Sequence, residues 1–142
     1  MNSTCDRFVA AARTYRGVRW HHLGRSRDGV DCIGLLLLAG RDAGLILPEP
    51  PPYARGHRGY DLARGLGALG REVSLLAARD GDVLLFADGT YPAHVGLRTT
   101  WADGRPAVLH AHARLRRVVE QPIAGPVDAT LRAAYRPAQL ED

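Results

Sequence analysis

The residues best suited to chemistry are one cysteine and two histidines in separate segments of the chain. Cys32 stands at the start of an apolar run that continues to Ala39, and Asp31 before it is suited to cap a helix. A cysteine in the first turn of a helix lies near unpaired N–H groups and the positive end of the helix dipole. Both favour the thiolate, so we expect Cys32 to have a lowered pKa and to act as a nucleophile. The alternative is a small hydrophobic residue that only packs.

A nucleophilic cysteine needs a base, and the chain contains six histidines: His21, His22, His57, His94, His110 and His112. His57 lies in an arginine- and glycine-rich stretch and is interpreted as a surface residue. His94 opens an apolar segment, where an imidazole must find a polar partner or act as one. If the segment of His110 pairs antiparallel with that of His94, the two rings meet on one face. A thiol, a base and a group that orients the base would form the arrangement of serine and cysteine hydrolases.

Two other interpretations of the histidines remain open. His110 and His112 are two residues apart, so on a strand they point to the same face and, with His94, would supply three zinc ligands. No C-x-x-C pair and no tight ligand motif accompanies them, so we predict no metal. The second interpretation is a set of core histidines that are satisfied by hydrogen bonds and take no part in catalysis.

Hydrophobic patterns and turn residues predict the elements that must position these groups. The predicted helices run from about Ser3 to Tyr15, from Cys32 to Gly40 and, less regularly, from Tyr60 to Leu69. The predicted strands are Val83–Phe86, Ala93–Arg98, Ala107–His112 and Arg117–Glu120, with turns that include Asp88–Gly89. A short helix over Pro126–Ala134 and an edge segment at Tyr135–Arg136 follow. Helices first and an antiparallel meander afterwards is the order of an α+β fold.

Composition and charge limit the possible classes of function. The 142 residues fit one domain, 1–142, and the 46% hydrophobic and 24% charged residues are ordinary for a globular protein. The net charge is +4, yet the arginines are scattered, apart from Arg25 with Arg27 and Arg114 with Arg116 and Arg117. They do not form a single stripe, so we predict no nucleic-acid binding. No apolar run is long enough for membrane insertion, and the N-terminus lacks the pattern of a signal peptide. The proline run Pro48–Pro52 is interpreted as an external strap that covers the sheet, and the alternative is a docking surface.

Several blocks of the sequence together resemble the NlpC-type cell-wall cysteine peptidases. The blocks are Gly17–Trp20 with Gly24 and Gly29–Leu35, then Gly81–Phe86, Ala93–Leu97 and Val108–Ala111. They occur in the family's order and span most of the chain. The resemblance implies a papain-like α+β fold in which the helix beginning at Cys32 packs against an antiparallel sheet.

The resemblance also implies roles for individual residues. It implies Cys32 as the nucleophile, His94 as the general base and His110 as the residue that orients His94. The implied substrate is the stem peptide of peptidoglycan, cut after its D-glutamyl residue, without a cofactor. The backbone N–H of Cys32 would contribute to the oxyanion hole, where one donor lowers the barrier by about 3 kcal/mol or more.

The residues expected to bind substrate are Trp20, Asp31, Arg25 and Arg27. The two arginines are candidates for bidentate contacts with stem-peptide carboxylates. Trp20 stands where many members of the family have tyrosine, and its indole offers a donor but no acceptor. Ile33 stands where many members have serine, which affects the bond that would be cut.

Within the family, the branch associated with tails of phages and gene-transfer particles is the most similar. The grounds are a domain that stands alone, the missing signal peptide and the basic stretch Trp20–Arg27. This branch implies a tail component made in the bacterial cytoplasm, with tail-tip or baseplate hub proteins as partners. Two alternatives are a structural plug or adaptor of the tail tip with little activity, and an acyltransferase or amidase that uses the same residues.

Overall fold

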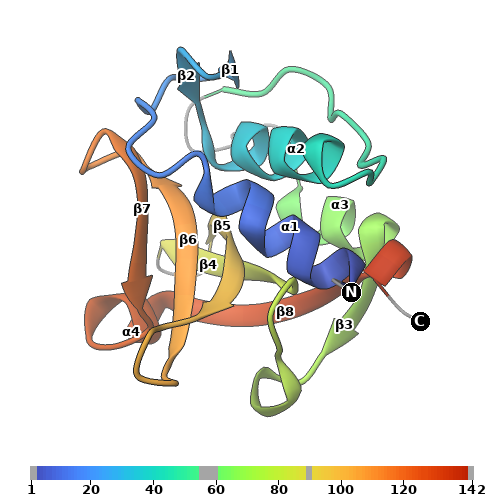
Figure 1. Cartoon of the computed structure of the whole chain (residues 1–142), viewed down its shortest axis with the longest axis vertical. Coiled ribbons are helices and arrows are strands. Elements are labelled where there is room, and N and C mark those ends of the chain that lie inside the picture. Colours follow the sequence, from blue (N-terminus) through green and yellow to red (C-terminus); the bar gives the residue numbers. More distant parts are fainter. Residues whose placement is uncertain (1–2, 55–60, 89–90, 141–142) are drawn as a thin grey trace.

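The computed structural model describes residues 3–54, 61–88 and 91–140. Its three longest helices lie on one side of an antiparallel sheet (Figure 1). The helices are α1 (Thr4–Arg13), α2 (Cys32–Asp42), α3 (Leu62–Leu69) and α4 (Pro126–Thr130), with 3-10 turns η2 (Leu75–Ala77) and η3 (Ala138–Leu140). The strands are β1 (Arg25–Ser26), β2 (Gly29–Val30), β3 (Gly70–Val73), β4 (Val83–Asp88), β5 (Tyr91–Thr100), β6 (Pro106–His112), β7 (Arg117–Pro122) and β8 (Leu131–Pro137). The position of His57 and part of the turn expected at Asp88–Gly89 lie outside the described residues.

The sheet confirms the predicted meander and corrects the prediction for its other half. Its order is β3-β8-β4-β5-β6-β7, in which β4 to β7 are the predicted antiparallel hairpins. The prediction of Tyr135–Arg136 as an edge segment is wrong, because β8 lies between β3 and β4 and pairs with both. The helix expected over Pro126–Ala134 ends at Thr130, because the backbone from Leu131 onward pairs with β4 instead. Tertiary pairing overrides the helix propensity of the two alanines in this segment.

Helix α1 begins at a capping box and packs through one face. The Ser3 side chain accepts from the Asp6 N–H, and the Asp6 carboxylate accepts from the Ser3 N–H. Phe8, Val9 and Ala12 form the buried face, as predicted, although the helix ends at Arg13 rather than Tyr15.

Helix α2 is buried over most of its circumference, and its N-terminus is packed against the preceding loop. A Cβ on Gly34 would lie 2.1 Å from the carbonyl oxygen of Gly24, and one on Gly24 would lie 2.4 Å from that of Gly29. Only glycine permits this approach of two backbones. The glycines around Cys32 therefore seat the loop of residues 18–30 directly on the first turn of α2.

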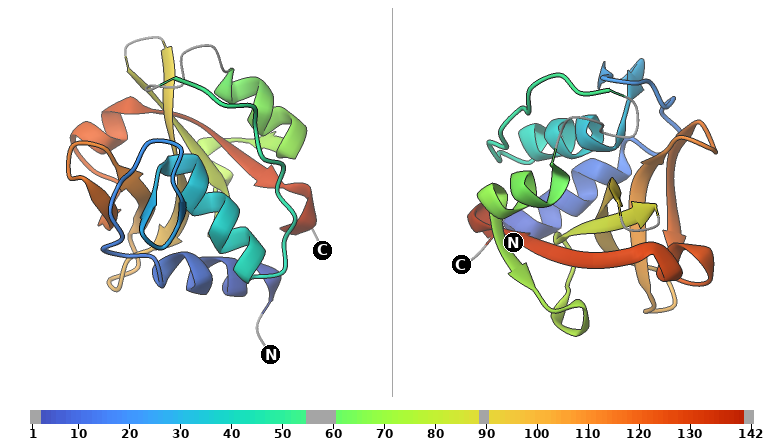
Figure 2. Two further views of the ribbon diagram at one scale, coloured as in Figure 1. Left: turned by 90° about the horizontal axis from the view of Figure 1, so that it is seen from above. Right: turned by 180° about the vertical axis from the view of Figure 1, so that it is seen from behind.

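The proline strap runs along α2 and α3 (Figure 2). Leu47, Pro48 and Pro50 close a mainly apolar pocket of about 70 Å³ together with residues of α2, α3, β4 and β5. This pocket contains no titratable side chain, so it lacks the groups that hydrolysis needs. The interpretation of the strap as a cover for the sheet stays a prediction, because the pocket that the strap closes is lined by α2 and α3 as well as by Val83 of β4 and Val95 of β5.

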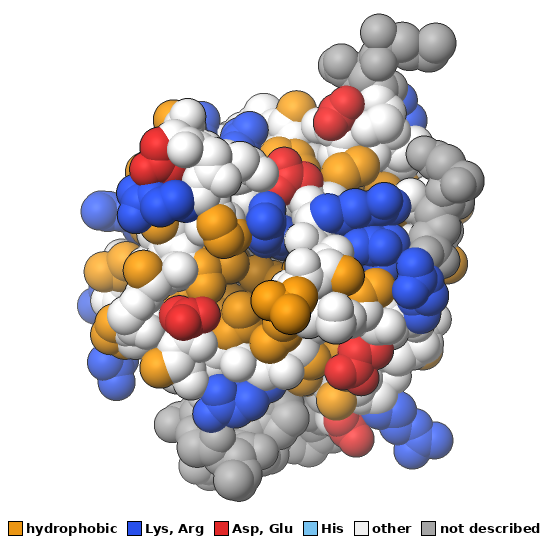
Figure 3. Space-filling view, turned by 90° about the horizontal axis from the view of Figure 1, so that it is seen from below, with side chains coloured by type: hydrophobic (Ala, Val, Ile, Leu, Met, Phe, Trp, Pro, Cys, Tyr) orange, Lys and Arg blue, Asp and Glu red, His pale blue; other side chains and the backbone are white. Residues whose placement is uncertain are grey.

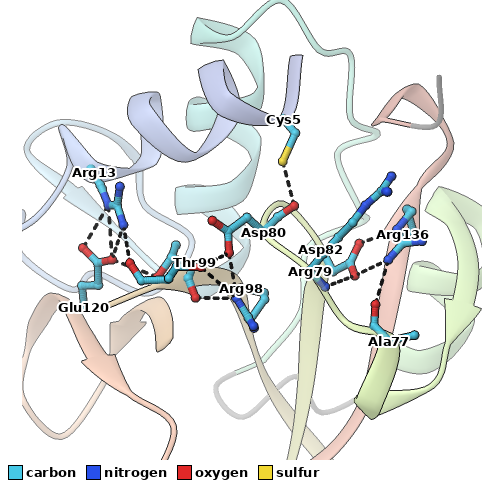
Figure 4. Close-up of polar contacts among 11 residues, drawn as sticks. Cys5, Arg13, Ala77, Arg79, Asp80, Asp82, Arg98, Thr99, Glu120 and Arg136 are labelled. Carbon is cyan, nitrogen blue, oxygen red and sulfur yellow. Dashed lines mark hydrogen bonds and ion pairs between the residues drawn. The ribbon is translucent and has the colours of Figure 1, made fainter. Parts of the chain in front are cut away.

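Buried and half-buried ion pairs hold the layers together below α1 (Figure 4). Arg136 of β8 donates two hydrogen bonds of 2.9 Å to Asp82, whose side chain is 1% exposed. Arg13 of α1 pairs with Glu120 of β7, which also accepts from the Thr99 hydroxyl. These contacts fix the helical layer and both halves of the sheet relative to one another.

The face of the sheet turned away from the helices carries a second, smaller hydrophobic cluster. Its buried members are Val73, Leu84, Phe86, Val108 and Ala134. Figure 3 views the molecule from this side and shows hydrophobic side chains gathered in a hollow with arginines around it. Of the helices in the described ranges, none combines the length and hydropathy that a membrane span requires.

Candidate active site

A pocket of about 100 Å³ lies at the N-terminus of α2, where the helix meets β5 and β6. It is lined by Trp20, His22, Asp31, Cys32, Tyr53, Ala93, His94, Ala111 and Ala113. The pocket therefore brings together Cys32 and His94 from segments that are far apart in sequence. Trp20 and Asp31, two of the residues expected to bind substrate, also line the pocket.

His94 is held by His110, as the predicted strand pairing requires. Strands β5 and β6 are antiparallel, and Nε2 of His94 lies 2.7 Å from Nδ1 of His110. The other nitrogen of His110, Nε2, lies 3.0 Å from Oε1 of Gln121 on β7. A carbonyl oxygen only accepts hydrogen bonds, so this contact places the His110 proton on Nε2.

The protonation of His110 then fixes the tautomer of His94. Burial of His110, which is 3% exposed, lowers its pKa to about 4, against the opposing effect of the bond to Gln121. His110 is therefore neutral at pH 7, and its Nδ1 accepts from the Nε2–H of His94. In neutral His94 the remaining nitrogen, Nδ1, is the one that accepts a proton. Gln121, His110 and His94 thus form a hydrogen-bonded chain, called the relay below, in which each side chain orients the next and His94 is the base in the pocket.

The pKa of Cys32 differs from the sequence-based expectation. Burial, reinforced by the charge of Asp31, raises the pKa of the Cys32 thiol to about 12, although the backbone N–H groups of Val95, Ile33 and Cys32 oppose this. The expectation of a lowered pKa is wrong because the side chain is 3% exposed and desolvation outweighs the helix terminus. At neutral pH the residue is a thiol, and a thiolate forms only when a neighbouring base takes the proton.

Asp31 is a structural hub beside the pocket. Its carboxylate accepts from the N–H groups of Gly34 and Leu23, from the Arg25 guanidinium and from the Tyr53 hydroxyl. The side chain is 3% exposed and caps α2. Four donors saturate the carboxylate, so its main effect is to fix the loop, the strap and the helix around Cys32.

The two arginines expected to bind substrate are engaged elsewhere in this structure. Arg25 donates to Asp31, Glu49 and Tyr53, and so connects the strap to the loop before α2. Arg27 lies over the ring of Tyr15, with 3.9 Å from its Cζ to the ring centroid, and donates to Thr14. Neither arginine lines the pocket, and their role in substrate binding remains a prediction.

His112 has a structural partner rather than a metal. Its Nδ1 accepts from the backbone N–H groups of Arg114 and Leu115 and so closes the turn between β6 and β7. Among the residues that the structure describes, no group of three or more acidic, cysteine or histidine side chains is placed to hold a metal ion. The zinc interpretation therefore has no support from the described part of the chain.

Three residues of the site were not singled out from the sequence. Gln121 and Tyr53 carry no local motif, because their partners are 11 and 22 residues away along the chain. His22 lines the pocket with its ring against that of Tyr53, at a centroid distance of 5.8 Å. Its position between Trp20 and Gly24 is the only feature of the sequence that could have indicated a place near the pocket.

The geometry of the site agrees with a comparison to protein families. The model of the NlpC/P60 family matches residues 17–132, a range that contains Cys32, His94 and His110. The chain belongs to the NlpC/P60 family. A comparison with curated proteins gives no match.

Solved structures of NlpC/P60 proteins share the fold. A Staphylococcus aureus protein of the NLP/P60 family, described as similar to a lipoprotein, has a TM-score of 0.70 at 23% identity, with 94% of this chain and 41% of that chain covered. The NlpC/p60 domain of the peptidoglycan hydrolase SagA has a TM-score of 0.68 at 18% identity, with 95% and 98% covered. Mycobacterium tuberculosis RipD, described as a non-catalytic NlpC/p60 protein adapted to peptidoglycan binding, has a TM-score of 0.65 at 20% identity, with 96% and 98% covered.

These comparisons confirm the papain-like α+β fold expected from the resemblance. The chain spans less than half of the Staphylococcus aureus structure, so that protein's activity and context do not carry over as a whole. The family contains both hydrolases and a non-catalytic member, so the chemistry of this NlpC/P60 domain must be argued from its own pocket.

Proposed function

We propose that this NlpC/P60 protein is a cysteine endopeptidase that hydrolyses an amide bond in the stem peptides of peptidoglycan. The observation that carries the proposal is the pocket that Cys32 and His94 share, with His94 held through His110 to Gln121. A domain that only binds peptidoglycan would need the pocket but would not need a thiol and an ordered imidazole relay within it. The SagA domain, named a peptidoglycan hydrolase, has the same fold.

In the proposed reaction, Nδ1 of His94 accepts the Cys32 proton while the sulfur attacks the carbonyl carbon of the stem peptide. The raised pKa of Cys32 favours this coupled transfer over a preformed ion pair. The oxyanion of the tetrahedral intermediate is stabilised by backbone N–H groups, of which that of Cys32 is the first candidate. His94 then protonates the leaving amine, and water, activated by the same imidazole, hydrolyses the thioester to release the acid and restore the thiol.

The finer details of the proposal rest on the sequence resemblance. We propose cleavage after the D-glutamyl residue, with Trp20 and Ile33 as the positions at which this chain departs from many members of the family. We also propose a place in the tail of a phage or phage-like particle, next to tail-tip or baseplate hub proteins. The support for this location is the basic stretch Trp20–Arg27, which resembles the tail-associated branch.

The deciding experiment is digestion of defined stem peptides by the wild-type protein and by Cys32→Ala and His94→Ala, with the products identified by mass. Cys5→Ala is the matched control, because Cys5 lies outside the pocket. We expect cleavage by the wild type and the control, and no cleavage by the other two variants. Equal cleavage by Cys32→Ala would refute the proposal.

A second candidate function is a binding module or tail-tip adaptor, which is favoured by the non-catalytic relative RipD. That function predicts retention of the protein on purified cell walls with no peptide product from any stem peptide offered. The digestion experiment above, combined with a cell-wall pull-down, separates the two candidates.

A further inference from the structure

Two groups among the described arginines differ in their partners. One group forms ion pairs with aspartate or glutamate side chains: Arg13, Arg16, Arg25, Arg27, Arg41, Arg98, Arg105 and Arg136. A second set is exposed and has no ion pair or side-chain hydrogen bond with any residue in the described ranges. Four of this set lie in two neighbouring segments and are called the basic edge: Arg19, Arg114, Arg116 and Arg117.

The backbone brings the members of the basic edge to one place. Arg19 and Arg117 form an isolated antiparallel bridge, and the N–H of Trp20 donates to the carbonyl oxygen of Arg116 over 2.9 Å. Two further backbone hydrogen bonds of 2.8 and 2.9 Å join Val18 and Gly17 to Val118. The segment of residues 17–20 is therefore joined to the start of β7. Arg19 and the three arginines of residues 114–117, which are at least 95 residues apart in sequence, cannot separate without breaking this junction.

The basic edge adjoins the pocket of Cys32. Trp20, which follows Arg19, and Ala113, which precedes Arg114, both line that pocket. A polymer that is bound in the pocket therefore contacts the sequence neighbours of Arg19 and Arg114, and its adjacent units lie next to the basic edge. The screening length at physiological ionic strength is about 8 Å, so these charges act on groups at the rim of the pocket.

Uncompensated arginines on two joined segments create a local positive potential that attracts anions. A guanidinium group presents paired N–H donors that match a carboxylate bidentately. In the second set the basic edge stands out, because Arg64 and Arg79 are isolated members on α3 and before β4. The site next to the pocket is therefore suited to a polymer that carries many carboxylates.

We infer that the basic edge binds carboxylates of peptidoglycan stem peptides adjacent to the one in the pocket, an inference that rests on the proposed function. The binding keeps the domain on the polymer between successive cleavages and contributes little to the cleavage of a short soluble peptide. The edge thus acts on affinity for the insoluble wall rather than on the chemistry at Cys32.

The test compares Arg114→Gln/Arg117→Gln with the charge-matched control Arg64→Gln/Arg79→Gln. Binding to purified sacculi is measured in a Cys32→Ala background, so that the sacculi are not digested. Single exposed ion pairs are weak, so we expect the loss of two arginines to weaken binding about fivefold, with a shallower salt dependence. We expect the control to bind as the parent does.

With Cys32 restored, both variants should cleave a short soluble stem peptide at the wild-type rate, and only the edge variant should be slower on sacculi. Equal binding of the edge variant and the control would overturn the inference. Binding that disappears when phosphate-containing wall polymers are stripped from the sacculi would also overturn it, because the ligand would then be phosphate. If the wild type cleaves no stem peptide, the proposed function fails, while the binding comparison still decides whether the edge holds the wall.

Discussion

Replacing Gln121 tests whether the relay of three side chains sets the base at Cys32. In Gln121→Leu the Nε2–H of buried His110 loses its acceptor, a bond of 3.0 Å. His110 then gains by moving its proton to Nδ1 and donating to His94, which forces the His94 proton onto the nitrogen that should act as the base. The variant is thus expected to hold His94 in the wrong tautomer for proton transfer from Cys32.

The size of the effect follows from the cost of a buried donor without an acceptor. That cost is about 1–3 kcal/mol, which corresponds to a decrease in kcat of between about 5-fold and 150-fold with KM unchanged. Gln121 lies half-buried on the edge strand β7, so leucine is compatible with the fold. The matched variant Gln121→Glu keeps an acceptor for Nε2–H and should retain most of the activity, with the acid limb of its pH profile shifted upward.

The assay is steady-state cleavage of a soluble stem peptide, together with nitrogen NMR of the histidine rings, which reports the tautomer of each ring. A Gln121→Leu enzyme with the wild-type kcat and an unchanged His94 tautomer would refute the reasoning. A loss of kcat in Gln121→Glu equal to that in Gln121→Leu would likewise show that the acceptor is not what matters.

Three further predictions follow from burial and packing. With Cys5→Ser as the background, alkylation of Cys32 by iodoacetamide should be slow at pH 7 and rise about tenfold per pH unit up to pH 10, because burial raises its pKa; a plateau near neutral pH would contradict this. His110 has a pKa of about 4 in the folded state against 6.5 unfolded, so the unfolded chain binds more protons between these values. Acidification from pH 7 to pH 4 should therefore lower the unfolding free energy of the wild type by about 3 kcal/mol more than it lowers that of His110→Asn. Urea titration at the two pH values measures both decreases. Gly34→Ala should lower the unfolding free energy by about 1–3 kcal/mol, because its Cβ would meet a carbonyl oxygen at 2.1 Å, whereas Gly67→Ala, with nothing within 4 Å, should not destabilise the protein.

The part of the site that could be predicted from sequence is the part encoded in local patterns. Asp31 before an apolar run gives the capped helix, and the position of Cys32 in its first turn follows directly. The short apolar segments around His94 and His110, with turn residues between them, give two antiparallel strands and a contact between the rings. In each case a short stretch of residues determines both the element and the direction of the side chain.

The features that escaped prediction depend on contacts between distant segments. Strand β3 has a single buried residue, Val73, so its sequence carries no hydrophobic alternation that could be recognised. The pKa of Cys32 depends on how completely the surrounding chain excludes water, which the N-terminal position on a helix does not reveal. The hydrogen bond between Gln121 and His110 depends on the pairing of β7 with β6, two strands whose register the sequence does not state.

The central place of β8 has a consequence for the order in which the molecule can become complete. Strands β3 and β4 are both synthesised before β8, yet each depends on β8 for its backbone partners on that side. Until β8 emerges from the ribosome, the nascent chain has two unpaired strand edges and a buried Asp82 without its Arg136 partner. Closure of the sheet is therefore a late, long-range step, and a chain interrupted after residue 130 should aggregate rather than form a working pocket.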